Sequence, residues 1–102
     1  MTRLLVTADA DSDFNDIISY LQQNAGARVA QNYTRRFNAT LDGLLLFPQT
    51  GSPRPGLGPN VRIAVVSPYI LIYDYLARDD TLVLLRILHE KRNITRRLVR
   101  RS

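Results

Sequence analysis

The side chains best suited to acid–base or phosphate chemistry lie in the second half of the chain. His89 is the only histidine, and the charged tripeptide EKR follows it directly. Histidine exchanges protons near neutral pH, and arginine binds phosphates and carboxylates with two parallel hydrogen bonds. Together with Arg62 and Arg86, His89 could move a proton and stabilise the charge of a reacting phosphate. The same arginines could equally bind an acidic protein without any chemistry.

Positive charge is concentrated in this same half of the chain. Residues 1–50 carry four arginines and five aspartates, whereas residues 51–102 carry ten basic and four acidic residues and sum to +6. Thirteen of the fourteen basic residues are arginine. Solubility alone does not require arginine in preference to lysine. Two interpretations stay open, a solvated basic surface and a polyanion or acidic-protein partner.

Length and composition exclude several classes of protein. A chain of 102 residues predicts a single domain with one modest core. The absence of cysteine and the single histidine argue against disulfides and zinc, and we expect neither a metal nor a cofactor. The N-terminus MTRLLVTADAD lacks the apolar region of a signal peptide, and no apolar run reaches the ~20 residues of a membrane span. We therefore expect a soluble cytoplasmic protein.

Residues 61–93 predict three neighbouring antiparallel strands. Their apolar, β-branched and aromatic runs are interrupted only at Ser67-Pro68 and at residues 78–80. Strict alternation predicts that one face holds Tyr69, Leu71, Tyr73 and Tyr75 of the middle strand, and that Val83, Leu85, Ile87 and His89 share a face of the last strand. Arg62, Asp74 and Arg86 are interspersed on apolar faces. We expect helices to cover one face and a partner to cover the other.

The first half predicts a strand over residues 3–7 followed by two helices. Apolar residues at helical spacing mark a helix over residues 10–25, with Thr7 or Asp9 as its N-cap and aspartates in its first turns, where the helix dipole favours them. Gly26 predicts the end of this helix, and a second apolar stripe predicts another over residues 27–46. A proline-rich loop over residues 48–60 then presents Arg54 at its centre.

The tail, residues 94–102, adds four arginines to the end of the chain. Ile94 and Leu98 are one helical turn apart, so a short basic helix could dock through them; a disordered basic tail is the alternative. The expected organisation is a single domain over residues 1–93 and a basic C-terminal tail over 94–102. Its fold class is α+β, in the order β-α-α-β-β-β, with a helical hairpin packed on one face of a mainly antiparallel sheet.

Several ordered patterns resemble the RelE/ParE toxin superfamily. Ala10, Asp13-Phe14, Ile17 and Tyr20 resemble its first helix, and Phe47-Pro48 with Gly51 resembles the exit from its second. Arg62 followed by Tyr69–Tyr73 is similar to its central hairpin. Residues 83–89, VLLRILH, with Arg92 resemble the ending of ParE proteins of the plasmid-stabilisation type. The resemblance covers residues 3–93.

ParE proteins are toxins of type II toxin–antitoxin systems that poison DNA gyrase and are neutralised by a ParD-type antitoxin. The resemblance thus implies a non-enzymatic gyrase inhibitor in a hetero-oligomer with its antitoxin. We expect the target or the antitoxin to contact Arg54, Arg62, Arg86, His89 and Arg92.

Two alternatives remain on the same fold. RelE-type toxins cleave messenger RNA on the ribosome, a role in which His89 would be catalytic. The chain departs from that pattern, because no tyrosine follows Tyr75 and its only glutamate and lysine are Glu90 and Lys91. A non-catalytic RNA- or protein-binding module is the other alternative.

Overall fold

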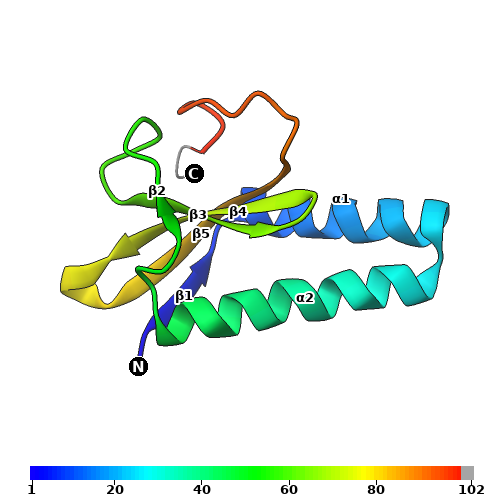
Figure 1. The fold of residues 1–102 in the computed structure, drawn as a ribbon, viewed down its shortest axis with the longest axis horizontal. Helices are drawn as coiled ribbons and strands as arrows, with labels where there is room; N and C mark the ends of the chain where they lie inside the picture. Colours follow the sequence, from blue (N-terminus) through cyan, green and yellow to red (C-terminus); the bar gives the residue numbers. More distant parts are fainter. Residues whose placement is uncertain (100–102) are drawn as a thin grey trace.

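Two helices pack on one face of a five-stranded sheet in the computed structural model, which describes residues 1–99 (Figure 1). The strand order is β1-β5-β4-β3-β2; β1 pairs with β5 in parallel, and every other pair is antiparallel. The predicted α+β class and the meander are confirmed. The elements in chain order are β1 (Arg3–Val6), α1 (Ala8–Ala25), α2 (Ala27–Leu46), β2 (Ser52–Pro53), β3 (Val61–Val66), β4 (Tyr69–Leu76), a 3-10 turn (Ala77–Asp79) and β5 (Thr81–His89).

The helical hairpin begins and turns at residues that the sequence marks. The Thr7 hydroxyl accepts a hydrogen bond from the Ala10 N–H at 3.0 Å and donates one to the Leu85 carbonyl at 2.8 Å, so the cap also ties the helix to β5. Gly26 has φ +94°, a conformation that favours glycine, and it ends α1 and begins α2. Helix α2 has the predicted bounds, whereas α1 starts two residues earlier than expected.

The core on the helix side of the sheet is built around the aromatic face of β4. Tyr69, Leu71 and Tyr73 lie in one cluster with Phe37 of α2, as the alternation of β4 predicts. Phe37 packs near Tyr69 at 5.8 Å between ring centroids. Ring pairs at such separations stabilise a core beyond the effect of burial alone.

The predicted alternation of β5 holds through Leu85 and is wrong beyond it, because a β-bulge interrupts the strand there. Ile72 and Tyr73 are neighbours in β4, yet their partners Arg86 and Leu84 are two residues apart. The extra residue is Leu85, and after it the two faces of β5 exchange. The helix-side cluster therefore takes Leu82, Leu84 and Ile87, while the opposite face takes Val83, Leu85 and Leu88.

The second face of the sheet is covered in part by the chain itself. Ile94, Leu98 and the buried Val99 pack on the cluster of this face, as does Leu57 from the loop before β3. We expected a partner to cover this face, and the structure shows that the segment after β5 folds back across part of it (Figure 1). Ile94 and Leu98 dock as predicted, but residues 96–99 form turns rather than a helix. The rest of the predicted tail, residues 100–102, lies outside the described residues.

The loop between α2 and β3 is held down by Tyr73. Its hydroxyl donates to the Pro48 carbonyl at 2.7 Å and accepts from the Gly51 N–H at 3.0 Å. A Cβ at Gly51 would collide with the Tyr73 hydroxyl and would lie 2.7 Å from the Ile63 carbonyl oxygen. The short strand β2, which the sequence analysis missed, follows directly and pairs with β3.

We predict that Gly51→Ala lowers the free energy of unfolding by about 1–3 kcal/mol, the usual range for overpacking a tight site. Gly43→Ala is the matched control: a Cβ there meets nothing within 4 Å, and replacing a helical glycine stabilises by roughly 0.5–1 kcal/mol. Urea unfolding of both variants gives the two values. Equal effects of the two substitutions would contradict the packing described for Gly51.

Candidate functional site

Arg86 is the centre of an ion pair that joins three parts of the chain. Its Nε and Nη2 donate to the two carboxylate oxygens of Asp13 at 2.7 and 2.9 Å, and its Nη1 donates to the Leu98 carbonyl at 2.9 Å. The side chains of Arg86 and Asp13 are only 15% and 14% exposed. The hydrogen bond with Asp13 raises the pKa of Arg86, so the guanidinium stays charged. Arg86 thus links α1, β5 and the C-terminal segment.

The position of Asp13 follows from where β1 ends. Strand β1 pairs with β5 only as far as Leu84, whose carbonyl accepts the Thr7 N–H at 3.1 Å. Beyond that point the carboxylate of Asp13 accepts the Ile87 N–H at 3.0 Å. A side chain of α1 therefore takes the place of a neighbouring strand along this part of the β5 edge.

Arg62 supports the loop before β2 rather than an open site. Its Nη1 donates to the carbonyls of Gln49 and Gly51, both at 2.8 Å. The side chain is half-buried, and Arg62 lies opposite Tyr73 of β4, whose hydroxyl bonds the same loop. Arg62 and Tyr73 together fix the path of the chain from α2 into the sheet.

Arg54, in contrast, is exposed. Its backbone N–H donates to the Val61 carbonyl at 2.8 Å, which closes the proline-rich loop, and its guanidinium donates to the neighbouring Pro53 carbonyl at 2.9 Å. Arg54 and Arg96 line a groove whose apolar residues are Leu57, Ile63, Ile70 and Ile94. This arginine-rimmed groove offers apolar contacts and positive charge side by side.

His89 and Arg92 lie together at the end of β5. The His89 ring packs edge-to-face on Tyr69, with 5.7 Å between centroids and an interplanar angle of 82°. Its Nδ1 accepts the Lys91 N–H at 3.1 Å, and its carbonyl accepts the Arg92 N–H at 2.9 Å. Both side chains are exposed and available to a partner.

The structure does not bring His89, Arg62 and Arg86 into one catalytic cluster. His89 pairs with Tyr69 of β4, whereas Arg62 pairs with Tyr73, four residues further along that strand, or about 13 Å. The guanidinium of Arg62 is directed to the loop before β2, and that of Arg86 to α1. The predicted residues instead divide into two that support the fold and three that are exposed.

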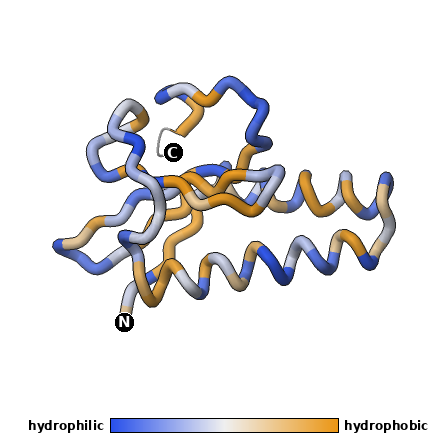
Figure 2. The backbone as a smooth tube through the Cα atoms, in the orientation of Figure 1, coloured by the Kyte–Doolittle hydropathy of each residue, from blue (hydrophilic) through white to orange (hydrophobic). Residues whose placement is uncertain are grey.

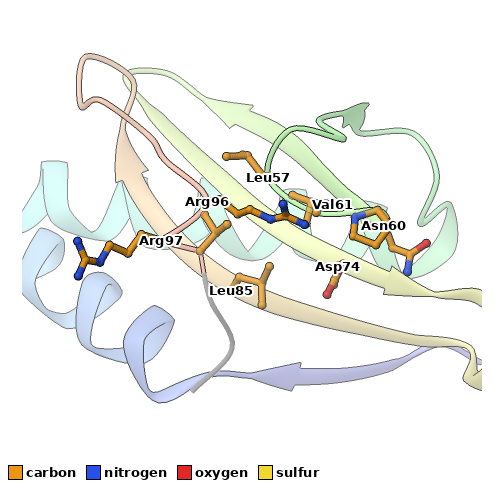
Figure 3. Close-up of a pocket in the computed structure, with 10 residues that line it drawn as sticks. Leu57, Asn60, Val61, Asp74, Leu85, Arg96 and Arg97 are labelled. Atoms are coloured by element: carbon orange, nitrogen blue, oxygen red, sulfur yellow. The ribbon is translucent and has the colours of Figure 1, made fainter.

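Sequence reasoning missed the role of Arg96 and Arg97. With Val99 they line a cavity of about 560 Å³ between the C-terminal segment and the sheet, together with Leu85 and the buried Asp74. Figure 3 shows Arg96 extended along this cavity toward Val61, and Arg97 directed away from it toward the helices. The sequence feature that could have indicated this role is the spacing of Ile94 and Leu98. Both pack on the sheet and thereby fix the positions of Arg96 and Arg97 between them.

Within residues 1–99 no group of three or more His, Cys, Asp or Glu side chains is placed to hold a metal ion. No helix in that range is long and apolar enough to cross a membrane.

The fold belongs to a known class. The chain resembles a solved chain of the "Chromosomal ParDE TA system from P. aeruginosa", with a TM-score of 0.72 and 21% identity over 87% of this chain and 96% of that one. At this identity the likeness concerns the fold.

Sequence comparison then shows the family. Residues 4–94 match the family described as "ParE toxin of type II toxin-antitoxin system, parDE", and the chain therefore belongs to the ParE toxin family. It is 28% identical to Toxin ParE3 of Caulobacter vibrioides over the full length of both chains. It is also 27% identical to Toxin ParE1 of the same organism, over 82% of this chain and 84% of that protein.

We predict that Arg86→Ala lowers the free energy of unfolding by about 2–3 kcal/mol, because it leaves the Asp13 carboxylate without its charged donor. Arg35→Ala, on the exposed side of α2, should change it by less than about 0.5 kcal/mol. Urea denaturation of the two variants, of Asp13→Ala and of the Arg86/Asp13 double variant measures the coupling. Additive single effects would mean that the pair does not stabilise the fold as a unit.

Proposed function

We propose that this ParE-family chain inhibits DNA gyrase and that a ParD-like antitoxin neutralises it by forming a hetero-oligomer. The observation that carries the proposal is the end-to-end similarity to Toxin ParE3, together with the family match over residues 4–94. The similar solved chain comes from a ParDE system, which supports an antitoxin as partner. The resemblance to ParE proteins supports gyrase as the target, and cytoplasm as the place of action.

The distribution of the cations favours inhibition by binding over catalysis. Cleavage of RNA at the 2′-hydroxyl requires a base, cations and an acid around one phosphate. Arg62 and Arg86 are hydrogen-bonded to backbone carbonyls and to Asp13, and His89 lies far along the sheet from Arg62. The chain is therefore better suited to grip a protein than to cleave a phosphodiester.

The arginine-rimmed groove is the surface that we propose for the antitoxin. Its apolar residues would receive the apolar anchors of a peptide, and Arg54 and Arg96 would bind its carboxylates. Such a segment is acidic and amphipathic, and it folds on binding. Arg92 and His89, which are exposed at the end of β5, remain candidates for contacts with the target or the antitoxin. Arg62 and Arg86 would act indirectly, by holding the loop and the C-terminal segment that flank this face.

The gyrase proposal predicts two results. Purified protein should inhibit DNA supercoiling by gyrase or trap cleaved DNA on it, and expression without antitoxin should induce the DNA-damage response before translation falls. His89→Gln should retain most of this inhibition, because glutamine keeps hydrogen bonding without titrating. Cleavage of messenger RNA on programmed ribosomes, lost in His89→Ala, would instead establish the nuclease alternative. If a folded sample shows neither activity, the binding-module alternative takes precedence.

The groove proposal predicts that Arg54→Ala weakens binding of the co-encoded antitoxin about tenfold, equivalent to ~1.4 kcal/mol, because a carboxylate of the peptide loses its partner. Arg35→Ala, an exposed arginine on α2, serves as the matched control and should leave the dissociation constant unchanged. Isothermal titration calorimetry measures both. If Arg35→Ala weakens binding more than Arg54→Ala, the antitoxin grips the helices instead.

A further inference from the structure

Strand β1 presents an unusual edge. It is the terminal strand of the sheet, and all four of its residues are exposed. Leu4, Leu5 and Val6 remain 36%, 45% and 48% exposed, and Figure 2 colours this stretch as hydrophobic. Folded proteins usually protect such an apolar edge, because it offers a template for pairing with another strand.

The backbone of β1 has hydrogen-bonding groups directed away from the sheet. The N–H groups of Arg3 and Thr7 donate inward, to the carbonyls of Asp80 and Leu84. Backbone groups of successive residues point to opposite sides of a strand, so those of Leu4 and Val6 face the open side. These two residues can together offer two donors and two acceptors to an added strand.

We propose that this edge binds β1 of a second copy of the chain, antiparallel and with Leu5 at the two-fold axis. In that register Leu4 lies opposite the partner's Val6 and exchanges both backbone hydrogen bonds with it, and the symmetric pair does the same. Leu5 meets the partner's Leu5 on the face where Val83 lies, and Leu4 meets the partner's Val6 on the helix side. The contact is isologous, as a two-fold dimer requires.

Charge along the strand favours a second copy in this register. β1 begins with the cationic Arg3 and leads into Asp9 and Asp11 in the first turn of α1. Antiparallel pairing puts Arg3 opposite the partner's Thr7, next to the acidic start of the partner's α1. A shift of the pairing that centres it on Leu4 would instead oppose Arg3 to the apolar Leu5 of the partner subunit.

A cavity with apolar lining lies beside this edge on the helix side of the sheet. Leu4 and Val6 line this cavity together with Phe14, Phe37 and Leu41. Side chains of the partner strand at this edge would extend that cluster. Because two short strands bury less than about 1,200 Å², the dimer is weak and forms in a concentration-dependent way. This pairing does not depend on the gyrase proposal.

Cysteine crosslinking tests the register, since the natural chain has no cysteine. Leu5→Cys should form an interchain disulfide under mild oxidation, because a pair that is not hydrogen-bonded brings the Cα atoms to about 4.5 Å, within disulfide range. Leu4→Cys is the matched control, because its thiol would face the partner's Val6. The cysteine of the partner strand would lie two residues further along that strand, and the Cα–Cα distance would exceed the ~7 Å limit for a disulfide. Crosslinking of Leu4→Cys as readily as Leu5→Cys would overturn the proposed register.

Sedimentation equilibrium tests the dimer without any crosslink. The average mass of the wild-type chain should rise from monomer toward dimer as its concentration increases to about 0.5 mM. Leu5→Lys should remain monomeric, whereas Val65→Lys, at a 59%-exposed position of β3, should associate like the wild type. A wild-type chain that stays monomeric would overturn the proposal, even if an added antitoxin strand then occupied β1. Equal loss in both lysine variants would do so as well.

Discussion

The two hydrogen bonds between Asp13 and Arg86 are the interaction on which the rest of the structure depends. They join residues 73 positions apart in the chain. The same carboxylate accepts the Ile87 N–H and so completes the edge of β5, while the guanidinium holds the Leu98 carbonyl. Because each charge is largely removed from water, loss of either partner leaves the other poorly compensated. The start of α1, the bulged strand and the C-terminal segment are thereby held in one arrangement.

This arrangement divides the arginines of the basic half by role. Arg62 and Arg86 donate to carbonyls and a carboxylate within the chain, and they hold segments in place. Arg54 and Arg96 border an apolar groove on the sheet face away from the helices. A surface that alternates apolar area with bidentate cations is suited to an acidic peptide, whereas a nucleic-acid backbone would gain little from the apolar part.

The sheet carries a core on each face, which is demanding for a chain of 102 residues. The helical hairpin covers one face. Within residues 1–99, a loop and a short terminal segment cover the other face through Leu57, Ile94, Leu98 and Val99. Apolar surface is consequently left at the margins, on β1 and on Val65 of β3, and of these two only β1 is proposed as a contact with a second copy, because its open backbone groups can pair with another strand.

Much of this architecture is determined by local sequence. Helical spacing of apolar residues, the Thr7 cap and Gly26 define the hairpin to within two residues, because each signal acts within a turn or two of the chain. The β-branched and aromatic runs define the meander, and the ordered motifs identify the family.

Tertiary structure alone decided which residues of β5 face the helices and what Arg86 binds. The bulge at Leu85 depends on how β5 pairs with β4, and a period-2 pattern within one strand contains no information about that pairing. In the sequence Asp13 is one of several acidic residues near a helix start, and only the packing of α1 against β5 selects it for Arg86. The sequence of the segment after His89 likewise indicates a basic tail. Its role as a cover depends on an apolar face that forms only when the strands pair. Local periodicity thus determined the elements, and long-range contacts determined the roles of the charged side chains.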